Sequence, residues 1–180
     1  MLVGGEIMEV TLFDMKYKEQ LKSLLIEAFP YSYGDTADEE VIKLTEEERI
    51  AIMAVEEDKL VGFVGAIPNY GITGWELHPM IVKKEYQKRG IGTKLVQALE
   101  KEALSKGAVT IYLGTDDEFD RTSLSNVDLY DNLYSEIENI KNLKMHPFEF
   151  YQKNGYKIVG VLPDVNGIGK PDIYMAKRIR

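Results

Sequence analysis

The segment Tyr86–Thr93 has the composition of a phosphate-binding turn; it reads Tyr-Gln-Lys-Arg-Gly-Ile-Gly-Thr. An apolar run precedes it and a helical pattern follows it, so Gly90 and Gly92 stand where a helix begins. The first N–H groups of a helix have no intrahelical acceptor, and the positive end of the helix dipole favours anions. Lys88 and Arg89 add positive charge there. The segment predicts a phosphate site, although a lone Gly-x-Gly also occurs in ordinary surface turns.

A carboxylate and an imidazole occur close together in the run before this turn, at Glu76 and His78. The run Trp75–Val82 has the pattern of a strand, and residues two apart on a strand project to the same side. Either group could remove a proton from a substrate, directly or through water. Glu76 could equally pair with a substrate ammonium, and a lone histidine in a strand can be purely structural.

The elements around these residues follow from apolar spacing. Ile91, Leu95, Leu99 and Ala103 recur at helical spacing, so the order is strand, basic turn, helix. Pro79 cannot donate a ladder hydrogen bond, so we expect a bulge or a separation of strands at that point.

The rest of the chain predicts further strands and helices. The predicted strands are 9–13, 49–55, 59–67, 109–115, 156–162 and 172–177, and the predicted helices are 16–29, 36–44, one within 116–146, and 147–153. We expect strands 49–55 and 59–67 to form an antiparallel hairpin, Thr36 to cap its helix, and residues 31–35 and 69–74 to be turns.

Composition narrows the function classes. A chain of 180 residues with 44% hydrophobic and 29% charged residues fits one globular domain, 1–180. It has no cysteine, which excludes disulfides, a thiolate nucleophile and thiolate metal ligands, and we predict no metal. A net charge of −8 disfavours nucleic acid and favours cationic partners. Without a membrane-length apolar run or a signal-like start, we expect a cytoplasmic protein; residues 1–7 have no assigned role.

The Gln-x-x-Gly-x-Gly pattern at Gln87, Gly90 and Gly92 resembles the acyl-CoA pyrophosphate loop of the GCN5-related N-acetyltransferases (GNAT). Further segments are similar to the aminoglycoside 6'-N-acetyltransferases of that family, and they lie in the family's order: Gly71–Pro79, Ile111–Asp117, Glu149–Gly160 and Lys170–Lys177.

The resemblance implies an α/β (α+β) fold. Its central sheet would be mixed and mostly antiparallel, splayed at the middle and flanked by helices. The pantetheine arm of acetyl-CoA would enter the gap between strand 75–82 and strand 109–115, where its amides pair with strand backbone groups. Relatives form homodimers, so we expect a homodimer here.

The same resemblance implies the residues that bind acetyl-CoA: Met80, Ile81, Val82, Gln87, Lys88, Arg89, Gly90, Ile91, Gly92, Thr93, Tyr151 and Asn154. The backbone N–H of Met80 would bind the thioester carbonyl, and Tyr151 would protonate the departing thiolate. The alternative for Tyr151 is core packing among its aromatic neighbours.

The acceptor is expected to be a cationic amine bound by acidic and aromatic side chains: Tyr33, Glu76, His78, Asp116 and Asp117. The leading hypothesis is acetylation of the 6'-amine of an aminoglycoside, an antibiotic-resistance activity, by direct attack in a ternary complex. One alternative is acetyl transfer to another cationic amine, such as a polyamine or a basic protein segment. A non-catalytic acyl-CoA-binding module is the other.

Overall fold

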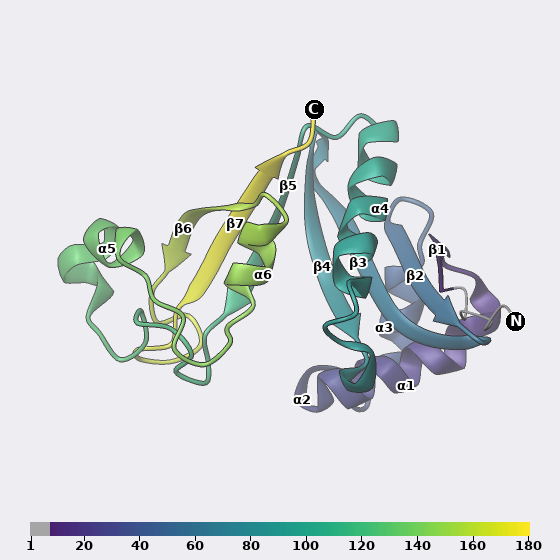
Figure 1. Ribbon diagram of the computed structural model, residues 1–180, viewed down its shortest axis with the longest axis horizontal. Helices are drawn as coiled ribbons and strands as arrows, with labels where there is room; N and C mark the ends of the chain where they lie inside the picture. The colour runs from purple at the N-terminus through teal and green to yellow at the C-terminus, as the bar shows by residue number, and fades with distance from the viewer. Residues whose placement is uncertain (1–7) are drawn as a thin grey trace, which may run out of the picture. The chain divides into compact units, whose positions relative to one another are not determined.

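The computed structural model describes residues 8–180, so the predictions for residues 1–7 lie outside the described part (Figure 1). The described chain forms two compact units. The first comprises the residues up to Val109 together with Ile179–Arg180, and the second comprises Thr110–Arg178.

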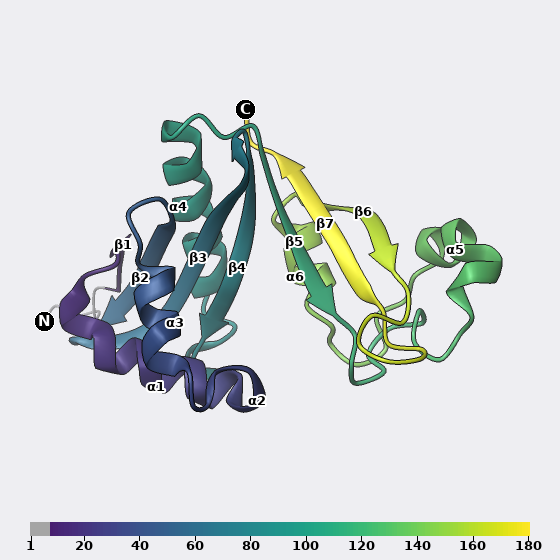
Figure 2. The same ribbon diagram turned by 180° about the vertical axis from the view of Figure 1, so that it is seen from behind.

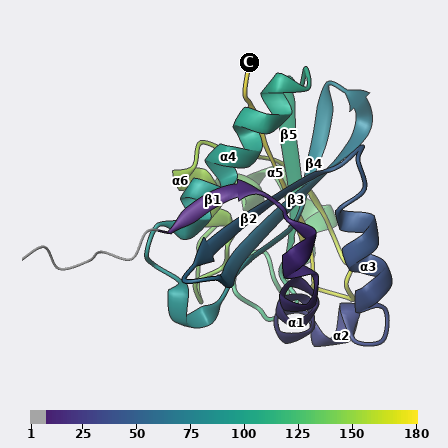
Figure 3. The same ribbon diagram turned by 90° about the vertical axis from the view of Figure 1, so that its right-hand side faces the viewer.

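The first unit is built on an antiparallel sheet in the order β1-β2-β3-β4, comprising β1 (Glu9–Leu12), β2 (Ile50–Glu56), β3 (Lys59–Ile72) and β4 (Gly74–Val82). Helices cover both of its faces, with α4 on one and α1 and α3 on the other (Figures 2 and 3). The helices of this unit are α1 (Lys18–Ala28), α2 (Pro30–Tyr33), α3 (Ala37–Leu44) and α4 (Ile91–Ser105), with short 3-10 turns at Met15–Tyr17 and Lys84–Tyr86.

Apolar stripes hold these helices on the sheet. Leu21 and Leu25 of α1 and Val41 of α3 are fully buried against Phe63 of β3. On the other face, Leu95 and its helical neighbours in α4 are buried as their spacing predicts. Each fully buried leucine contributes roughly 1.5–3 kcal/mol of transfer free energy.

The second unit has an antiparallel sheet in the order β5-β7-β6, with β5 (Thr110–Asp116), β6 (Lys157–Leu162) and β7 (Asp172–Arg178). Helix α6 (Phe148–Lys153) lies on one face of it, and α5 (Leu129–Glu138) lies beside β6 (Figures 1 and 2). Seen from behind, the other face of β5 and β7 carries no helix of this unit in the described residues (Figure 2).

The predicted strands and most helices are confirmed, with small shifts of their ends. The hairpin β2–β3 turns at Glu57 and Asp58, which both have positive φ as a two-residue type I′ turn requires. Within 116–146 the predicted helix is α5, which begins at its N-cap Asp128. Gly155 ends α6 with a φ of +91°.

Three local predictions are wrong. Residues 31–35 are not all a turn, because Pro30 begins the helix α2, where its fixed φ is favourable. Residues 69–74 are not all a turn either, since β3 continues to Ile72 and Tyr70 pairs with Gly74. Thr36 occupies the N-cap of α3, but its side chain makes no cap hydrogen bond.

The predicted interruption at Pro79 is confirmed. The β3–β4 register passes from Val64↔Met80 to Ala66↔Leu77, so His78 and Pro79 together stand opposite Gly65. This is a β-bulge on β4. A Cβ on Gly65 would lie 2.7 Å from the carbonyl oxygen of His78, so the bulge depends on glycine at this position.

We predict that Gly65→Ala destabilises the protein by about 1–3 kcal/mol, the usual cost of overpacking a core, because a backbone atom cannot move aside as a side chain can. The matched control is Gly160→Ala in β6, whose added Cβ would meet no heavy atom within 4 Å. The control should change stability by less than about 1 kcal/mol. Urea unfolding of both variants measures the difference, and equal midpoints would contradict the bulge constraint.

Candidate active site

The strand β4 presents Glu76 just before the bulge and His78 within it. Glu76 is half-buried and stands opposite Ile67 of β3, and its carboxylate accepts a hydrogen bond from the side-chain amide of Asn69. His78 is exposed, and its Nε2 lies 3.1 Å from the hydroxyl of Tyr33. Both titratable groups are therefore held by neighbours within the first unit.

Tyr33 is a buried residue, whereas a side chain that contacts an acceptor directly would be exposed. Its side chain is 8% exposed, and its ring packs edge-on against Phe29 at a centroid distance of 5.6 Å. Burial, and then the charge of Glu40, raise the pKa of Tyr33 above its usual value. A neutral phenol in contact with His78 fixes the imidazole ring, so Tyr33 is best described as a positioning residue.

The turn after β4 is closed by hydrogen bonds to the sheet. The backbone N–H of Lys83 donates to the carbonyl of Val61 at 2.9 Å, and the side-chain amide of Gln87 donates to the carbonyl of Val82 at 3.0 Å. Gln87 thus holds the turn against the end of β4, and its side chain has a structural role.

Helix α4 begins where the sequence predicts a phosphate site. Gly90 is its N-cap with a left-handed φ of +80°, and Lys88 before it also has a positive φ, +61°. The N–H of Lys94 is bonded to the carbonyl of Gly90, which leaves the N–H groups of Ile91, Gly92 and Thr93 as the first turn without intrahelical acceptors. The buried side chain of Ile91 fixes this turn to the sheet.

The guanidinium of Arg89 forms an ion pair with Glu56. Its two terminal nitrogens donate to the two carboxylate oxygens at 2.6 and 3.2 Å, and it lies over the ring of Tyr86. The Glu56 side chain is 5% exposed, whereas that of Arg89 is 47% exposed. Arg89 therefore neutralises a buried carboxylate while remaining partly exposed, and Lys88 beside it is also exposed.

Tyr151 of α6 is buried, and its ring packs against Phe150 and Tyr156 at centroid distances of 5.1 and 5.8 Å. Burial raises the pKa of Tyr151 well above its ordinary range, so it is a neutral hydroxyl at neutral pH. Asn154 caps the same helix through a hydrogen bond from its side-chain amide to the carbonyl of Phe150 at 2.8 Å.

The two acidic residues after β5 have different environments. Asp117 is completely buried and accepts four hydrogen bonds, from the N–H of Arg121, the N–H and hydroxyl of Thr122, and the hydroxyl of Ser125. Burial alone would raise the pKa of Asp117, but these hydrogen bonds outweigh it and lower the pKa. Asp117 stabilises its loop, and Asp116 is the exposed member of the predicted pair.

His146, the other histidine, is a buried structural group. Its Nε2–H donates to the carbonyl of Asp116 at 3.0 Å, and its Nδ1 accepts from the N–H of Phe148 at 3.2 Å. These bonds require the neutral ring, and burial lowers the pKa of His146. It anchors the end of β5 to the start of α6.

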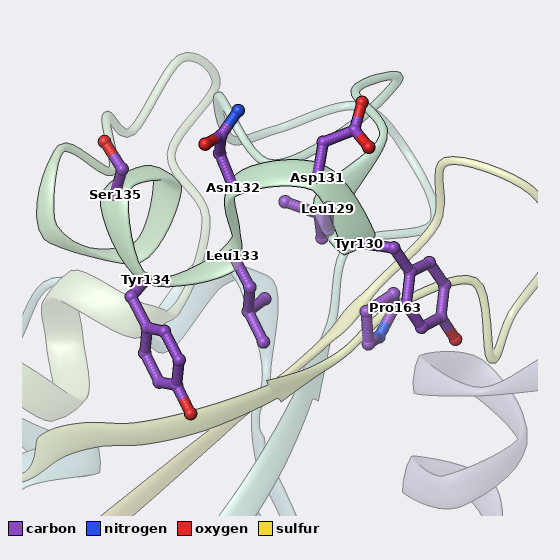
Figure 4. A pocket seen from close by; sticks show the side chains of 8 residues that line it. All are labelled: Leu129, Tyr130, Asp131, Asn132, Leu133, Tyr134, Ser135 and Pro163. Carbon is purple, nitrogen blue, oxygen red and sulfur yellow. The ribbon is translucent and has the colours of Figure 1, made fainter.

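A hollow of about 530 Å³ lies beside α5 in the second unit, where Tyr130 and Tyr134 point to the same side as Leu133 and Pro163 (Figure 4). None of the predicted site residues lines it. Residues 8–180 contain no cluster of acidic and histidine side chains suited to hold a metal ion, and no helix among them is long and apolar enough to cross a bilayer.

Comparison with known proteins identifies the family and the fold. Residues 18–131 match the model of the acetyltransferase (GNAT) family, and the chain belongs to that family. The fold is the α/β fold of the family, with a mixed, mostly antiparallel arrangement of strands and flanking helices. A search of curated proteins gave no match.

Three solved structures are similar over nearly the whole chain. An aminoglycoside 6'-N-acetyltransferase complexed with coenzyme A is 54% identical, with a TM-score of 0.94, covering 96% of this chain and 97% of that one. The aminoglycoside 6'-N-acetyltransferase from Enterococcus faecium is also 54% identical over the same shares, with a TM-score of 0.93. An aminoglycoside 6'-acetyltransferase type Ii is 48% identical over 96% and 97%, with a TM-score of 0.76.

Sequence reasoning missed two partners of the predicted residues. Glu56 lies between the predicted strands 49–55 and 59–67 and is in fact the last residue of β2, where a buried carboxylate needs a cation as its partner. The contact of Tyr33 with His78 joins residues 45 positions apart and has no sequence signal.

We predict that Arg89→Met lowers the free energy of unfolding by about 1–3 kcal/mol, because it leaves the buried carboxylate of Glu56 without its charged donor. Lys88→Met is the matched control and should change stability by less than about 0.5 kcal/mol, as surface substitutions usually do. Urea denaturation measures both. Equal stability of the two variants would show that the ion pair with Glu56 has no structural importance.

Proposed function

We propose that this protein transfers the acetyl group of acetyl-CoA to the 6'-amine of an aminoglycoside. The observation that carries the proposal is the 54% identity over 96% of the chain to an aminoglycoside 6'-N-acetyltransferase, at a TM-score of 0.94. The acidic balance of the chain, with a net charge of −8, supports a polycationic acceptor.

Acetyl-CoA is held by the end of β4 and the start of α4. In this proposal Met80, Ile81 and Val82 pair with the pantetheine arm, and the N–H groups of Gly90–Thr93 face the pyrophosphate. The φ of Gly90 and the burial of Ile91 support it, because both fix the first turn of α4. The exposed ammonium of Lys88 adds charge, while Arg89 contributes its backbone. A related enzyme was crystallised with coenzyme A.

The reaction forms a bond from the acceptor nitrogen to the thioester carbonyl carbon and breaks the bond from that carbon to sulfur. The attacking amine must be neutral, so a proton has to leave the ammonium first. Glu76 accepts this proton or holds the ammonium, directly or through water, and His78, oriented by Tyr33, is the second candidate base. The backbone N–H of Met80 stabilises the carbonyl oxygen as negative charge develops on it.

Tyr151 assists the departing thiolate. A phenol has an ordinary pKa near 10 and a thiol one near 8.5, so full proton transfer from Tyr151 to the sulfur is unfavourable. Burial raises the pKa of Tyr151 further. Its hydroxyl therefore acts best as a hydrogen-bond donor to the developing thiolate, which then takes up the proton released by the amine.

The proposal treats residues 1–180 as one catalytic domain. The family match, residues 18–131, crosses the boundary between the two compact units at Val109, which supports a single functional domain.

We also propose that the protein is a homodimer. The second unit exposes apolar side chains near its loops, with Met145, Val165 and Ile168 at 82%, 51% and 94% exposure, and a second copy would cover them. Sedimentation equilibrium tests this, and a monomer at micromolar concentration would contradict it.

Acetyl transfer is tested by measuring thiol release with three classes of acceptor: aminoglycosides, polyamines and basic peptides. We predict that kcat/KM is highest, by at least about tenfold, for aminoglycosides, because their several ammonium groups match several carboxylates. A higher kcat/KM for polyamines or basic peptides would contradict the aminoglycoside as acceptor. Binding of coenzyme A without turnover of any acceptor would favour a non-catalytic binding module.

We predict that Tyr151→Phe lowers kcat by about tenfold to a hundredfold, the range expected for one hydrogen bond to a charged group. The KM for acetyl-CoA and the melting temperature should change little, since the ring is retained. Tyr156→Phe, at a second buried tyrosine beside it, is the matched control and should keep wild-type kcat. If Tyr151→Phe is fully active while the chemical step is shown to be rate-limiting, Tyr151 does not assist the departing thiolate.

A further inference from the structure

A second β-bulge lies in the β3–β4 pairing, on the other side of Glu76 from the bulge described above. The residues Pro68 and Asn69 of β3 together stand opposite Trp75 of β4, where the register changes. Pro68 cannot donate a ladder hydrogen bond, which accounts for the interruption. The extra residue is on β3 here and on β4 at the first bulge, so the register is displaced only between the two. Glu76 therefore lies in a short paired segment with a bulge at each end.

The side chain of Asn69 reaches from the second bulge to this segment. Its amide donates a hydrogen bond to Oε2 of Glu76. A carboxylate only accepts hydrogen bonds, so the nitrogen end of the amide faces it. Hydrogen bonds to an ionised acceptor are stronger than those between neutral groups. The bond therefore restricts the rotation of the Glu76 carboxylate.

The loop that follows Asn69 is fixed to the sheet, although the side chain of Asn69 is itself exposed. The indole N–H of Trp75, which is buried, donates to the carbonyl of Ile72 at 2.9 Å. The N–H of Val109 donates to the carbonyl of Thr73 at 2.9 Å. These bonds hold the end of the hairpin, and with it the backbone that carries the Asn69 amide.

Glycine is required where the second bulge ends. Gly74 stands opposite Tyr70 in the register, and a Cβ on Gly74 would lie 2.8 Å from the Cβ of Tyr70. The strands come so close here that a larger residue would push them apart. The position of Asn69 relative to Glu76 is thus set by the backbone and not by the side chains alone.

Each titratable side chain of this part of β4 contacts a neutral polar partner from another element. The hydroxyl of Tyr33, from α2, contacts His78, and the amide of Asn69, from β3, contacts Glu76. Neither partner adds a charge to the site. Both can orient a titratable group while leaving the charge of the site to that group.

We propose that Asn69 is a positioning residue for acetyl transfer, whose amide holds the Glu76 carboxylate in the orientation that takes the proton of the acceptor ammonium. The inference rests on the proposed function, which it deepens by naming a residue that acts through Glu76. A glutamate side chain has several rotatable bonds, and fixing them costs conformational entropy. The bond from Asn69 offsets this cost before the acceptor binds, so the carboxylate is already oriented when the amine arrives.

The test is a double-mutant cycle on the kcat/KM for neomycin, an aminoglycoside with an amine at the 6' position. Asn69→Leu keeps the approximate shape of the side chain and removes the donor, and Glu76→Gln removes the charged acceptor. We predict that Asn69→Leu lowers kcat/KM by about tenfold in the wild-type background, the scale of one hydrogen bond to a charged group. In the Glu76→Gln background the same change should lower it by less than about twofold, because the group that Asn69 orients is gone.

Two further variants separate positioning from a structural role. Asn69→Gln keeps the amide, so its kcat/KM should stay within about threefold of the wild-type value. Gln97→Leu, which removes an exposed amide on α4, is the matched control and should match the wild type. The KM for acetyl-CoA and the melting temperature should change little in the Asn69 variants, since surface substitutions usually have small effects on stability.

Two results of the cycle would overturn the inference. An equal loss of kcat/KM in both backgrounds would mean that Asn69 acts by another route, such as direct contact with the acceptor. Wild-type kcat/KM in Asn69→Leu would mean that the orientation of Glu76 does not depend on the bond.

Failure of the proposed function would be seen separately, as absence of acetyl transfer by the wild-type protein to any acceptor. In that case the bond is measured without activity, from the side-chain amide signals of Asn69 in proton–nitrogen correlation NMR. A shift of these signals in Glu76→Gln, absent in the control Gln97→Leu, supports the positioning of Glu76 by Asn69. Signals that do not change in Glu76→Gln overturn it.

Discussion

The interruption of the β3–β4 pairing is the constraint on which the first unit depends. His78 and Pro79 together face a single residue, Gly65, and the carbonyl of His78 comes so close that a side chain there is excluded. The bulge at His78 and Pro79 lies between Glu76 and the stretch Met80–Val82. One strand can therefore present titratable side chains at one end and backbone groups at the other, each held by its own contacts with β3.

Buried charge is treated in two ways in this protein. Glu56 and Asp117 are buried with donors to both oxygens, and each fixes a loop: Glu56 holds Arg89 beside the start of α4, and Asp117 holds the turn after β5. Asp172 is buried opposite Asp116, and hydrogen bonds from Thr115, Tyr174 and Ile173 do not fully offset its burial and the charge of Asp116, so its pKa is raised to about 6. Glu56 and Asp117 are therefore buried as well-compensated charges, whereas Asp172 takes up a proton more readily.

Much of this organisation could be predicted from sequence, because it is local. The helical spacing from Ile91, the bulge at Pro79 and the helix after Pro147 each follow from the properties of adjacent residues, and all are confirmed. The long-range partners could not be predicted. Residues Arg89 and Glu56, or Tyr33 and His78, meet only after the strands have taken their register, and single-sequence patterns do not contain that information.

Acidic clusters show the same limit. Asp116 and Asp117 are adjacent and chemically identical in the sequence, yet one is exposed and the other is the best-bonded carboxylate of its unit. Strand alternation predicts that they face opposite sides, but it does not say which side is the core. Asp117 lies just after the end of β5, and it is buried because the folded loop brings the donors of Arg121, Thr122 and Ser125 to its carboxylate.

The central claim is that acetyl is transferred to the 6'-amine of an aminoglycoside. The most direct measurement compares neomycin with paromomycin, which differ in having an amine or a hydroxyl at the 6' position, in acetyl-CoA-dependent thiol release with the product identified by NMR. The account predicts rapid turnover with neomycin and a product acetylated on the 6' nitrogen. With paromomycin it predicts a kcat/KM lower by at least about a hundredfold, because this compound lacks the amine that accepts the acetyl group. Equal rates with the two compounds, or acetyl on another nitrogen of neomycin, would contradict it.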